Sequence, residues 1–281
     1  MLNYNIKYFM QIRIFQCLMN KKFILLLLFQ VVFIAKTSGQ DFNSIKMGAE
    51  QGSDTAQYKL GYFYFISMDE NKHAFFWFKK SAEQGNADAQ YSLGIMYDKG
   101  LGTTADKQQA FSWYKKSAEQ GNDIAQYSLG KLYYAGEGTL IDKQQAFYWY
   151  KKSAEHGFVL AQYSLGFMYY AGEGTPTDKQ QAFYWYKESA DKGNDKAQYH
   201  LGLMYYTGVG TSVDKKKALY WYKKSAEQDN DKAQYKLGLM YYSGQGTLRD
   251  MKVAAFWLKK SYYNGNKNAN EAWAKLLLFT Y

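Results

Sequence analysis

Residues 161–172 show the hydrophobic pattern that recurs along this chain. They read AQYSLGFMYYAG, and their apolar positions are three or four residues apart: Ala161, Leu165, Met168 and Tyr169. This spacing is typical of one face of an amphipathic α-helix. Gly172 comes soon after the last apolar position. Because glycine tolerates a positive φ, we expect the helix to end there.

A second helical pattern begins after the short loop EGTPT. Asp178 stands where an N-cap residue is expected, and Gln181 follows three residues later, which is the spacing of a capping box. Small and aromatic residues at helical spacing predict the buried face: Ala182, Trp185, Tyr186, Ser189 and Ala190. We expect Gly193 to end this helix. In a later copy Asp229 takes that place, where it must adopt a left-handed conformation with some strain.

This pair of helices recurs six times. Its tryptophan returns every 36 residues, at Trp77, Trp113, Trp149, Trp185, Trp221 and Trp257. The segment AQYKLG and its equivalents begin at Ala56, Ala89, Ala125, Ala161, Ala197 and Ala233, and only the first step is shorter. One helix pair cannot bury its aromatic face alone, whereas stacking the next copy covers it. The pattern predicts an all-α solenoid of helix–turn–helix repeats with a 36-residue period.

The repeat divides the chain into predicted units. Residues 40–55 resemble the end of a second helix and are predicted to cap one end of the array. Residues 269–281 begin like a first helix and are predicted to cap the other end. Between them, residues 56–268 form six repeats: 56–88, 89–124, 125–160, 161–196, 197–232 and 233–268.

A glycine lies in the middle of the first helix in five successive repeats: Gly94, Gly130, Gly166, Gly202 and Gly238. Glycine costs about 1 kcal/mol relative to alanine inside a helix. We therefore expect a close approach of the second helix at this point, against small residues such as Ala118 and Ala154.

Within residues 1–39, the stretch from Met19 onward has the three-part plan of a secretory signal peptide. Lys21 and Lys22 precede an apolar run from Phe23 to Ala35, and the small residues of KTSGQ suit a cleavage site. The run is short for a membrane span, which needs about 20 residues. We predict an exported protein, periplasmic or secreted, and the alternative is a membrane anchor formed by an uncleaved signal. Translation from the first methionine or from Met19 is left open.

Positive charge is concentrated at the N-terminus. The net charge is +10, from 35 basic and 25 acidic residues, and residues 1–40 hold five basic residues and no acidic one. The remaining charge is not gathered into a basic stripe, so no nucleic-acid partner is predicted. The single cysteine, Cys17, excludes an intrachain disulfide.

No constellation of residues indicates catalysis or a cofactor. The three histidines, His73, His156 and His200, occupy different places in their repeats, and no metal-binding spacing is present. The Gly136-x-Gly138 segment follows a helix rather than a strand, so it does not fit a phosphate loop. We predict a non-enzymatic protein without a metal or a cofactor.

Lysine pairs recur on the polar side of the second helices: Lys115–Lys116, Lys151–Lys152, Lys223–Lys224 and Lys259–Lys260. They are interpreted as a solvated face. The alternative is loose contact with anionic lipid or polysaccharide.

These residues together resemble the Sel1-like repeat, a branch of the tetratricopeptide superfamily. One copy of the motif stands at Ala125, Leu129, Gly130, Tyr133, Gly136, Gly138, Asp142, Ala146, Trp149, Tyr150, Ala154, Glu155 and Gly157, and the resemblance covers about residues 45–281. It implies a right-handed α-superhelix whose first helices line the concave surface. It also implies a scaffold or adaptor that holds other proteins, with an envelope or host-contact role in secreted bacterial members.

Tyrosines recur on the face that this resemblance places on the concave side: Tyr134, Tyr170, Tyr206 and Tyr242. Three residues before each lies a variable position, occupied by Lys131, Phe167, Leu203 and Leu239. Residues three apart share a helix face, and tyrosine gives a large contact area at low entropy cost. We predict that these eight residues bind a protein or peptide partner. The alternative is that the tyrosines only pack between repeats.

Two other classes of function stay open. The solenoid could organise envelope proteins without a defined peptide groove. A hydrolase of cell wall or β-lactams is disfavoured, because no nucleophile and base converge. The cysteine-rich relatives credited with β-lactamase-like binding also carry disulfides, which this chain lacks.

Overall fold

The computed structural model describes residues 42–66 and 70–277, and these residues form fourteen helices and no strand. The first helices of the six repeats are α4 (Asp54–Ile66), α6 (Ala87–Lys99), α8 (Asp123–Ala135), α10 (Val159–Ala171), α12 (Asp195–Thr207) and α14 (Asp231–Ser243). The second helices are α5 (Asn71–Glu83), α7 (Lys107–Glu119), α9 (Lys143–Glu155), α11 (Lys179–Asp191), α13 (Lys215–Glu227) and α15 (Met251–Tyr263). The ends are α3 (Phe42–Glu50) and α16 (Lys267–Leu277).

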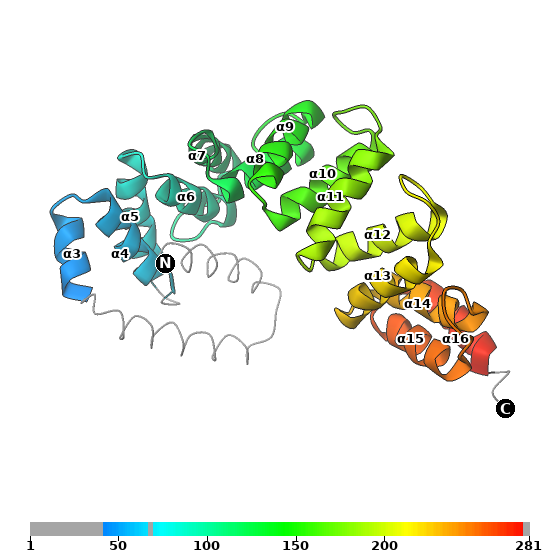
Figure 1. Ribbon diagram of the computed structural model, residues 1–281. Helices are drawn as coiled ribbons and strands as arrows, with labels where there is room; N and C mark the ends of the chain where they lie inside the picture. Colours follow the sequence, from blue (N-terminus) through cyan, green and yellow to red (C-terminus); the bar gives the residue numbers. More distant parts are fainter. Residues whose placement is uncertain (1–41, 67–69, 278–281) are drawn as a thin grey trace.

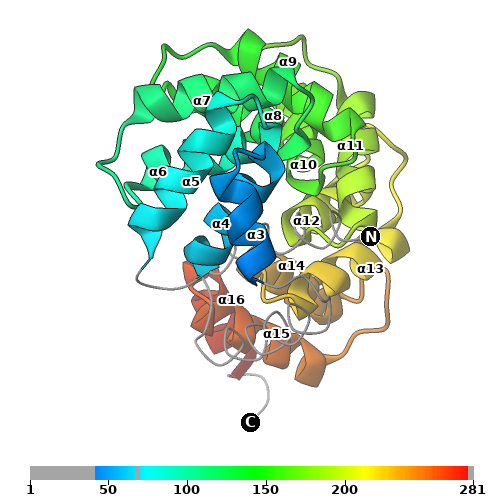
Figure 2. The ribbon, with the colours of Figure 1, turned by 90° about the vertical axis from the view of Figure 1, so that its left-hand side faces the viewer.

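The helices stack in chain order into a curved array, which confirms the predicted all-α solenoid (Figure 1). Figure 2 looks along the array and shows α8, α10, α12 and α14 closer to its centre than α9, α11, α13 and α15. The first helices therefore form the inner face, and the second helices form the outer face. In the part of the chain that the structure describes, no helix is both long and apolar enough to span a bilayer. The predicted signal peptide lies outside the described residues.

The helix ends follow the capping residues that the sequence predicts. Gly172 adopts a left-handed conformation (φ 74°) and ends α10, and its amide donates to the carbonyl of Met168. Asp178 caps α11 by accepting from the amides of Gln180 and Gln181. Asp229 has a φ of 65°, as expected for a residue that replaces a glycine in this turn.

The prediction of a capping box is wrong in one respect. The amide of Asp178 donates to the carbonyl of Tyr169 in the preceding helix (2.9 Å), so it does not need the side chain of Gln181. The same bond joins Asp214 to Tyr205 (2.9 Å) in a repeat that has no glutamine at that position. In the second to sixth repeats the first helix thus supplies the second half of the cap.

The core of each repeat is built around the residue that follows the tryptophan: a tyrosine in the second to fifth repeats, Phe78 in the first and Leu258 in the sixth. Tyr186 is fully buried with Ala182, Ser189 and Ala190, as predicted, but Trp185 is only half-buried. Trp149 is an exception at 8% exposed, and it belongs to a cluster that extends over the second, third and fourth repeats.

The mid-helix glycines make room for this core aromatic ring. A Cβ atom at Gly166 would lie 2.9 Å from the ring of Tyr186, and one at Gly130 would lie 2.7 Å from Tyr150. The helices do approach closely here, as expected. However, the neighbour that demands glycine is a tyrosine at four of the five positions and Leu258 at Gly238, not the alanines that the sequence pattern indicated.

Two buried polar residues join the helices in every repeat. Within a pair, the serine near the end of the second helix donates to a backbone carbonyl at the start of the first, as Ser189 does to Val159 (2.8 Å). Between repeats, the glutamine of the first helix donates to the end of the preceding second helix, as Gln162 does to Ala154 (3.3 Å). A buried hydrogen bond that is broken leaves a desolvated group unpaired, so these contacts fix the register of the stack.

Candidate partner-binding face

The eight residues predicted to bind a partner lie on the first helices α8, α10, α12 and α14, which form the inner face. Three of the tyrosines are half-buried, and Tyr242 is 38% exposed. At the variable position Lys131 is exposed, whereas Phe167, Leu203 and Leu239 are half-buried and also contact the core. The inner face thus carries partly accessible aromatic and aliphatic side chains. Its four tyrosines, Tyr134, Tyr170, Tyr206 and Tyr242, are called the tyrosine row below.

A cation from the same repeat lies over each ring of the tyrosine row. The Nζ atom of Lys143 is 2.9 Å from the ring centroid of Tyr134, and the Nζ of Lys215 is 3.2 Å from that of Tyr206. Lys179 covers Tyr170 in the same way, and Arg249 lies 5.4 Å from the ring of Tyr242. The three lysines are the first residues of second helices, so the loop of each repeat sets this contact.

Two of the four hydroxyl groups of the row reach the loop of the next repeat. Tyr206 donates to Gln245 Oε1 at 2.6 Å. Tyr134 hydrogen-bonds to Glu173, and that bond, together with Lys143 at 3.3 Å, holds the pKa of the Glu173 carboxyl below its usual range. The side chains of Tyr134 and Tyr206 are therefore each held by a cation and by a hydrogen bond.

The second repeat departs from this arrangement because Asp98 stands where the tyrosine would be. Lys107 ion-pairs with Asp98 and with Glu137 of the next loop (2.8 Å). Burial alone would raise the pKa of Asp98, but hydrogen bonds from Lys107 and Lys99 bring it below its usual range. This end of the inner face is charged rather than aromatic.

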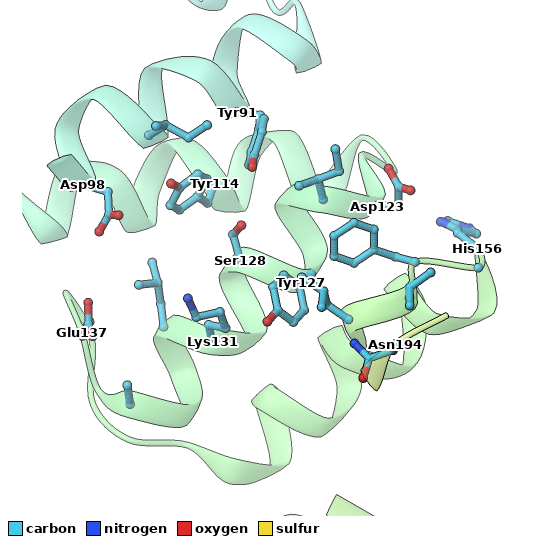
Figure 3. A pocket seen from close by; sticks show the side chains of 18 of the residues that line it. Tyr91, Asp98, Tyr114, Asp123, Tyr127, Ser128, Lys131, Glu137, His156 and Asn194 are labelled. Carbon is cyan, nitrogen blue, oxygen red and sulfur yellow. The ribbon is translucent and has the colours of Figure 1, made fainter. Parts of the chain in front are cut away.

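A pocket of about 840 Å³ opens on the inner face beside this charged group (Figure 3). Its apolar lining includes Ile95, Ile124, Tyr127, Phe158 and Leu160. Its polar lining includes Asp98, Glu137 and Lys131, and Figure 3 shows Lys131 between this acidic pair and Tyr127. The pocket therefore combines an apolar wall with a charged edge.

Of the predicted residues only Lys131 lines this pocket, and the sequence reasoning missed its other members. A signal was present. When each repeat is counted from the residue that caps its first helix, as it is from here on, the fourth repeat begins Phe158-Val159-Leu160, where the fifth begins Asn194-Asp195-Lys196. Three polar positions of the repeat are thus replaced by apolar ones in one copy. Comparison of the repeats position by position would have found them.

The outer face carries the lysine pairs. In three of the four pairs the first lysine lies near the glutamate four residues on, as Lys115 does to Glu119 (3.9 Å). The second lysine lies over an aromatic ring of its own helix, which is a tryptophan for Lys116 (4.1 Å) and Lys260 and a tyrosine for Lys152 and Lys224. Exposed ion pairs of this kind contribute little to stability, typically below about 1 kcal/mol.

The histidines have separate environments. His200 stacks on the ring of Tyr186 (centroids 5.0 Å apart, planes 9° apart), and burial lowers its pKa to about 4. His73 contacts Glu70, and His156 is exposed at the pocket edge. Among residues 42–66 and 70–277, no three potential metal ligands come together.

The comparisons with known proteins agree on one family. A family model described as Sel1 repeat matches six consecutive segments: 54–86, 87–122, 123–158, 159–194, 195–230 and 231–266. No curated protein matches the chain.

Two solved structures are similar to most of this chain. The Escherichia coli protein c5321, described as a protective antigen of uropathogenic strains with an SLR fold, is 35% identical over 85% of this chain, with a TM-score of 0.80. The match spans only 52% of that longer protein. A Sel1 repeat protein from Oxalobacter formigenes is 32% identical over 76% of this chain and 88% of its own, with a TM-score of 0.72.

Proposed function

We propose that this chain, which belongs to the Sel1 repeat family, is an exported, non-enzymatic scaffold that holds a segment of another protein against its concave helix face. Sel1 repeat proteins are generally protein-interaction scaffolds. The specific proposal adds the face that binds, the peptide-like form of the bound segment and the export of the chain.

The tyrosine row is the observation that carries the proposal. Tyr134, Tyr170, Tyr206 and Tyr242 return at the same place in four consecutive first helices and keep part of their surface accessible. Aromatic rings of this kind bury much area on binding and lose few rotamers, which is why tyrosine is enriched at binding interfaces. A row repeated along the array suits an extended segment better than a single small molecule.

The internal contacts of the row support binding by lowering its entropic cost. The lysines over Tyr134, Tyr170 and Tyr206, and the hydrogen bond from Tyr206 to Gln245, hold these side chains in one orientation. A surface that is already ordered loses less freedom when a partner binds. The variable position beside each tyrosine then offers a different side chain to each part of the segment, which supports selectivity between partners.

The test compares the two faces of the same two repeats. A partner is first isolated from the native host by crosslinking and pull-down. Its affinity is then measured for the inner double variant Tyr170→Ser with Tyr206→Ser, and for the outer double variant Tyr184→Ser with Tyr220→Ser. The outer pair is a matched control, because Tyr184 and Tyr220 are 50% and 51% exposed on the second helices α11 and α13.

We expect the inner variant to weaken binding by about 100-fold or more, because hot-spot truncations cost about 2 kcal/mol each. The outer variant should change the affinity by less than about threefold, the range of ordinary surface substitutions. Both affinities are measured at a temperature well below the melting temperatures of the two variants. Intact binding by the inner variant, or loss only as it unfolds, would show that the tyrosines are structural.

A further inference from the structure

A hydrogen bond between an asparagine and an aspartate joins consecutive repeats, but it is absent on both sides of the fourth repeat. Elsewhere the asparagine that caps a first helix donates its side-chain amide to an aspartate of the preceding repeat: Asn86 to Asp54 (3.0 Å), Asn122 to Asp88 (2.9 Å) and Asn230 to Asp195 (2.9 Å). The fourth repeat begins with Phe158 and Val159. Phe158 has no amide to donate and does not cap α10 with its side chain, and Val159 offers no carboxylate to Asn194.

Apolar side chains take the place of these polar links. Phe158 is 8% exposed and packs on the ring of Tyr127, with centroids 5.1 Å apart. Ile124 is buried and Leu160 half-buried, at a repeat position where the fifth and sixth repeats carry Lys196 and Lys232. The junction between the third and fourth repeats keeps the hydrogen bond from Gln162 to Ala154, but an apolar wall replaces the asparagine–aspartate bond, and the pocket opens along this wall.

Lys131 supplies a charge at the edge of the same pocket. The equivalent position is apolar in the neighbouring repeats, with Ile95 before it and Phe167 after it. Lys99 and Lys107 also line the pocket, but both ion-pair with Asp98. Lys131 is exposed, and no carboxylate within residues 42–66 or 70–277 forms an ion pair with it. Lys192, Asp123 and Asp195 also line the pocket, so the lining as a whole is not positive, but Lys192 donates to the carbonyl of Gly157 (3.0 Å). Lys131 is therefore the lining lysine that can pair with a carboxylate of a bound segment.

We propose that this pocket receives one bulky apolar side chain, aromatic or branched aliphatic, from the bound segment, and that Lys131 pairs with the carboxylate of an acidic residue next to it. This inference rests on the proposed function, because the tyrosine row would hold the rest of the segment. The volume, about 840 Å³, is within the range of pockets that enclose a ligand of drug size, which leaves room for the flanking backbone. The pocket thus fixes the register of the segment along the repeats.

Restoring the ordinary repeat sequence gives a sharp test. The triple variant Phe158→Asn, Val159→Asp and Leu160→Lys copies the start of the fifth repeat, Asn194-Asp195-Lys196. It regains the cap and the inter-repeat hydrogen bonds, so its melting temperature should stay equal or rise. A second variant, Lys131→Leu, copies Leu203 of the fifth repeat and removes only the charge.

A displayed library of random heptapeptides serves as the probe for the intact chain. We expect selected peptides to share an apolar residue beside an aspartate or glutamate, and the best synthetic peptide to bind the triple variant at least about tenfold more weakly. Lys131→Leu should keep the apolar preference and lose the acidic one. Three outcomes would each overturn the inference. The triple variant could bind the peptide as tightly as wild type, the library could give no peptide that binds wild type better than it binds the triple variant, or the selected peptides could carry a basic residue where an acidic one is expected.

The two proposals fail in different ways. If the native partner binds the inner double variant of the tyrosine row as tightly as wild type, the proposed function is wrong. If that variant loses the partner and the triple variant keeps it, the concave face binds but this pocket does not take part.

Discussion

At the scale of single residues, buried polar side chains do as much as the aromatic rings to define the repeat. Ser189 and Gln162 are buried, and each donates to a backbone carbonyl of a neighbouring helix. Helical spacing placed Ser189 on the buried face, whereas the burial of Gln162 was not predicted. Since an unpaired buried polar group is costly, a stack with the wrong register would be penalised at every repeat.

His200 makes a residue-scale prediction about pH. Burial, with a smaller contribution from Lys232, lowers its pKa to about 4, against about 6.5 in an unfolded chain. Below pH 6.5 the unfolded state therefore binds a proton more readily than the folded state. The free energy of unfolding should fall as the pH drops from 6.5 to 4, by up to about 3 kcal/mol, and this contribution should then level off.

The matched variant is His200→Ser, because Ser128 and Ser164 occupy the same place in the third and fourth repeats. Denaturant melts between pH 7 and pH 4 should show a smaller loss of stability for this variant than for wild type. His156→Gln, at an exposed position, should behave like wild type. Equal pH dependence in wild type and His200→Ser would mean that His200 protonates freely in the folded chain.

At the scale of elements, each Gly-x-Gly loop packs directly against the backbone of the preceding repeat. Gly174 has a φ of 69°, and a Cβ atom there would lie 2.0 Å from the carbonyl oxygen of Lys143, at the start of α9. The loop after α10 therefore rests directly on the backbone of the preceding second helix. Only glycine allows both the conformation and the approach.

Gly174→Ala should be much more destabilising than Gly193→Ala. Both positions have positive φ, but a Cβ atom at Gly193 would meet nothing within 4 Å. Gly193→Ala isolates the conformational cost, about 1–2 kcal/mol. Gly174→Ala adds a clash with backbone, so it should also raise hydrogen exchange in α9 and α11. Equal melting temperatures for the two variants would show that the loop does not bear on α9.

Sequence pattern alone predicts the elements well because their signals are local. Gly172 and Asp178 mark helix ends through their own backbone and side-chain chemistry, and the 36-residue period fixes the stacking. The pocket was not predicted, since it depends on which side chains of three successive first helices meet. The cation over each tyrosine was missed for the same reason: Lys143 and Tyr134 are brought together by a loop whose shape the pattern does not reveal.

At the scale of the whole molecule, the proposed export depends on residues outside the repeats. It rests on Lys21, Lys22 and the apolar run from Phe23 to Ala35. We expect N-terminal sequencing of the protein from its host to begin near Gly39 or Gln40, with the protein in the periplasmic or secreted fraction. A chain that keeps the apolar run and is found in the membrane fraction would favour the anchor instead.

The curvature of the array gives the molecule two faces of different chemistry. The inner face holds the tyrosine row and the pocket, whereas the outer face holds the lysine pairs and exposed rings such as Tyr184 and Phe256. The outer aromatics also recur every 36 residues. Recurrence by itself therefore does not identify the binding face, and the central claim is that the partner lies on the inner one.

Site-specific photocrosslinking in the native host tests this claim most directly. A photoreactive phenylalanine is placed at Phe167 or Tyr242 on the inner face, and at Tyr184 or Phe256 on the outer face, where each replaces an aromatic ring. We predict that the partner is crosslinked from Phe167 and Tyr242 and not from the outer positions. Crosslinking from Tyr184 and Phe256, with none from the inner positions, would contradict the account.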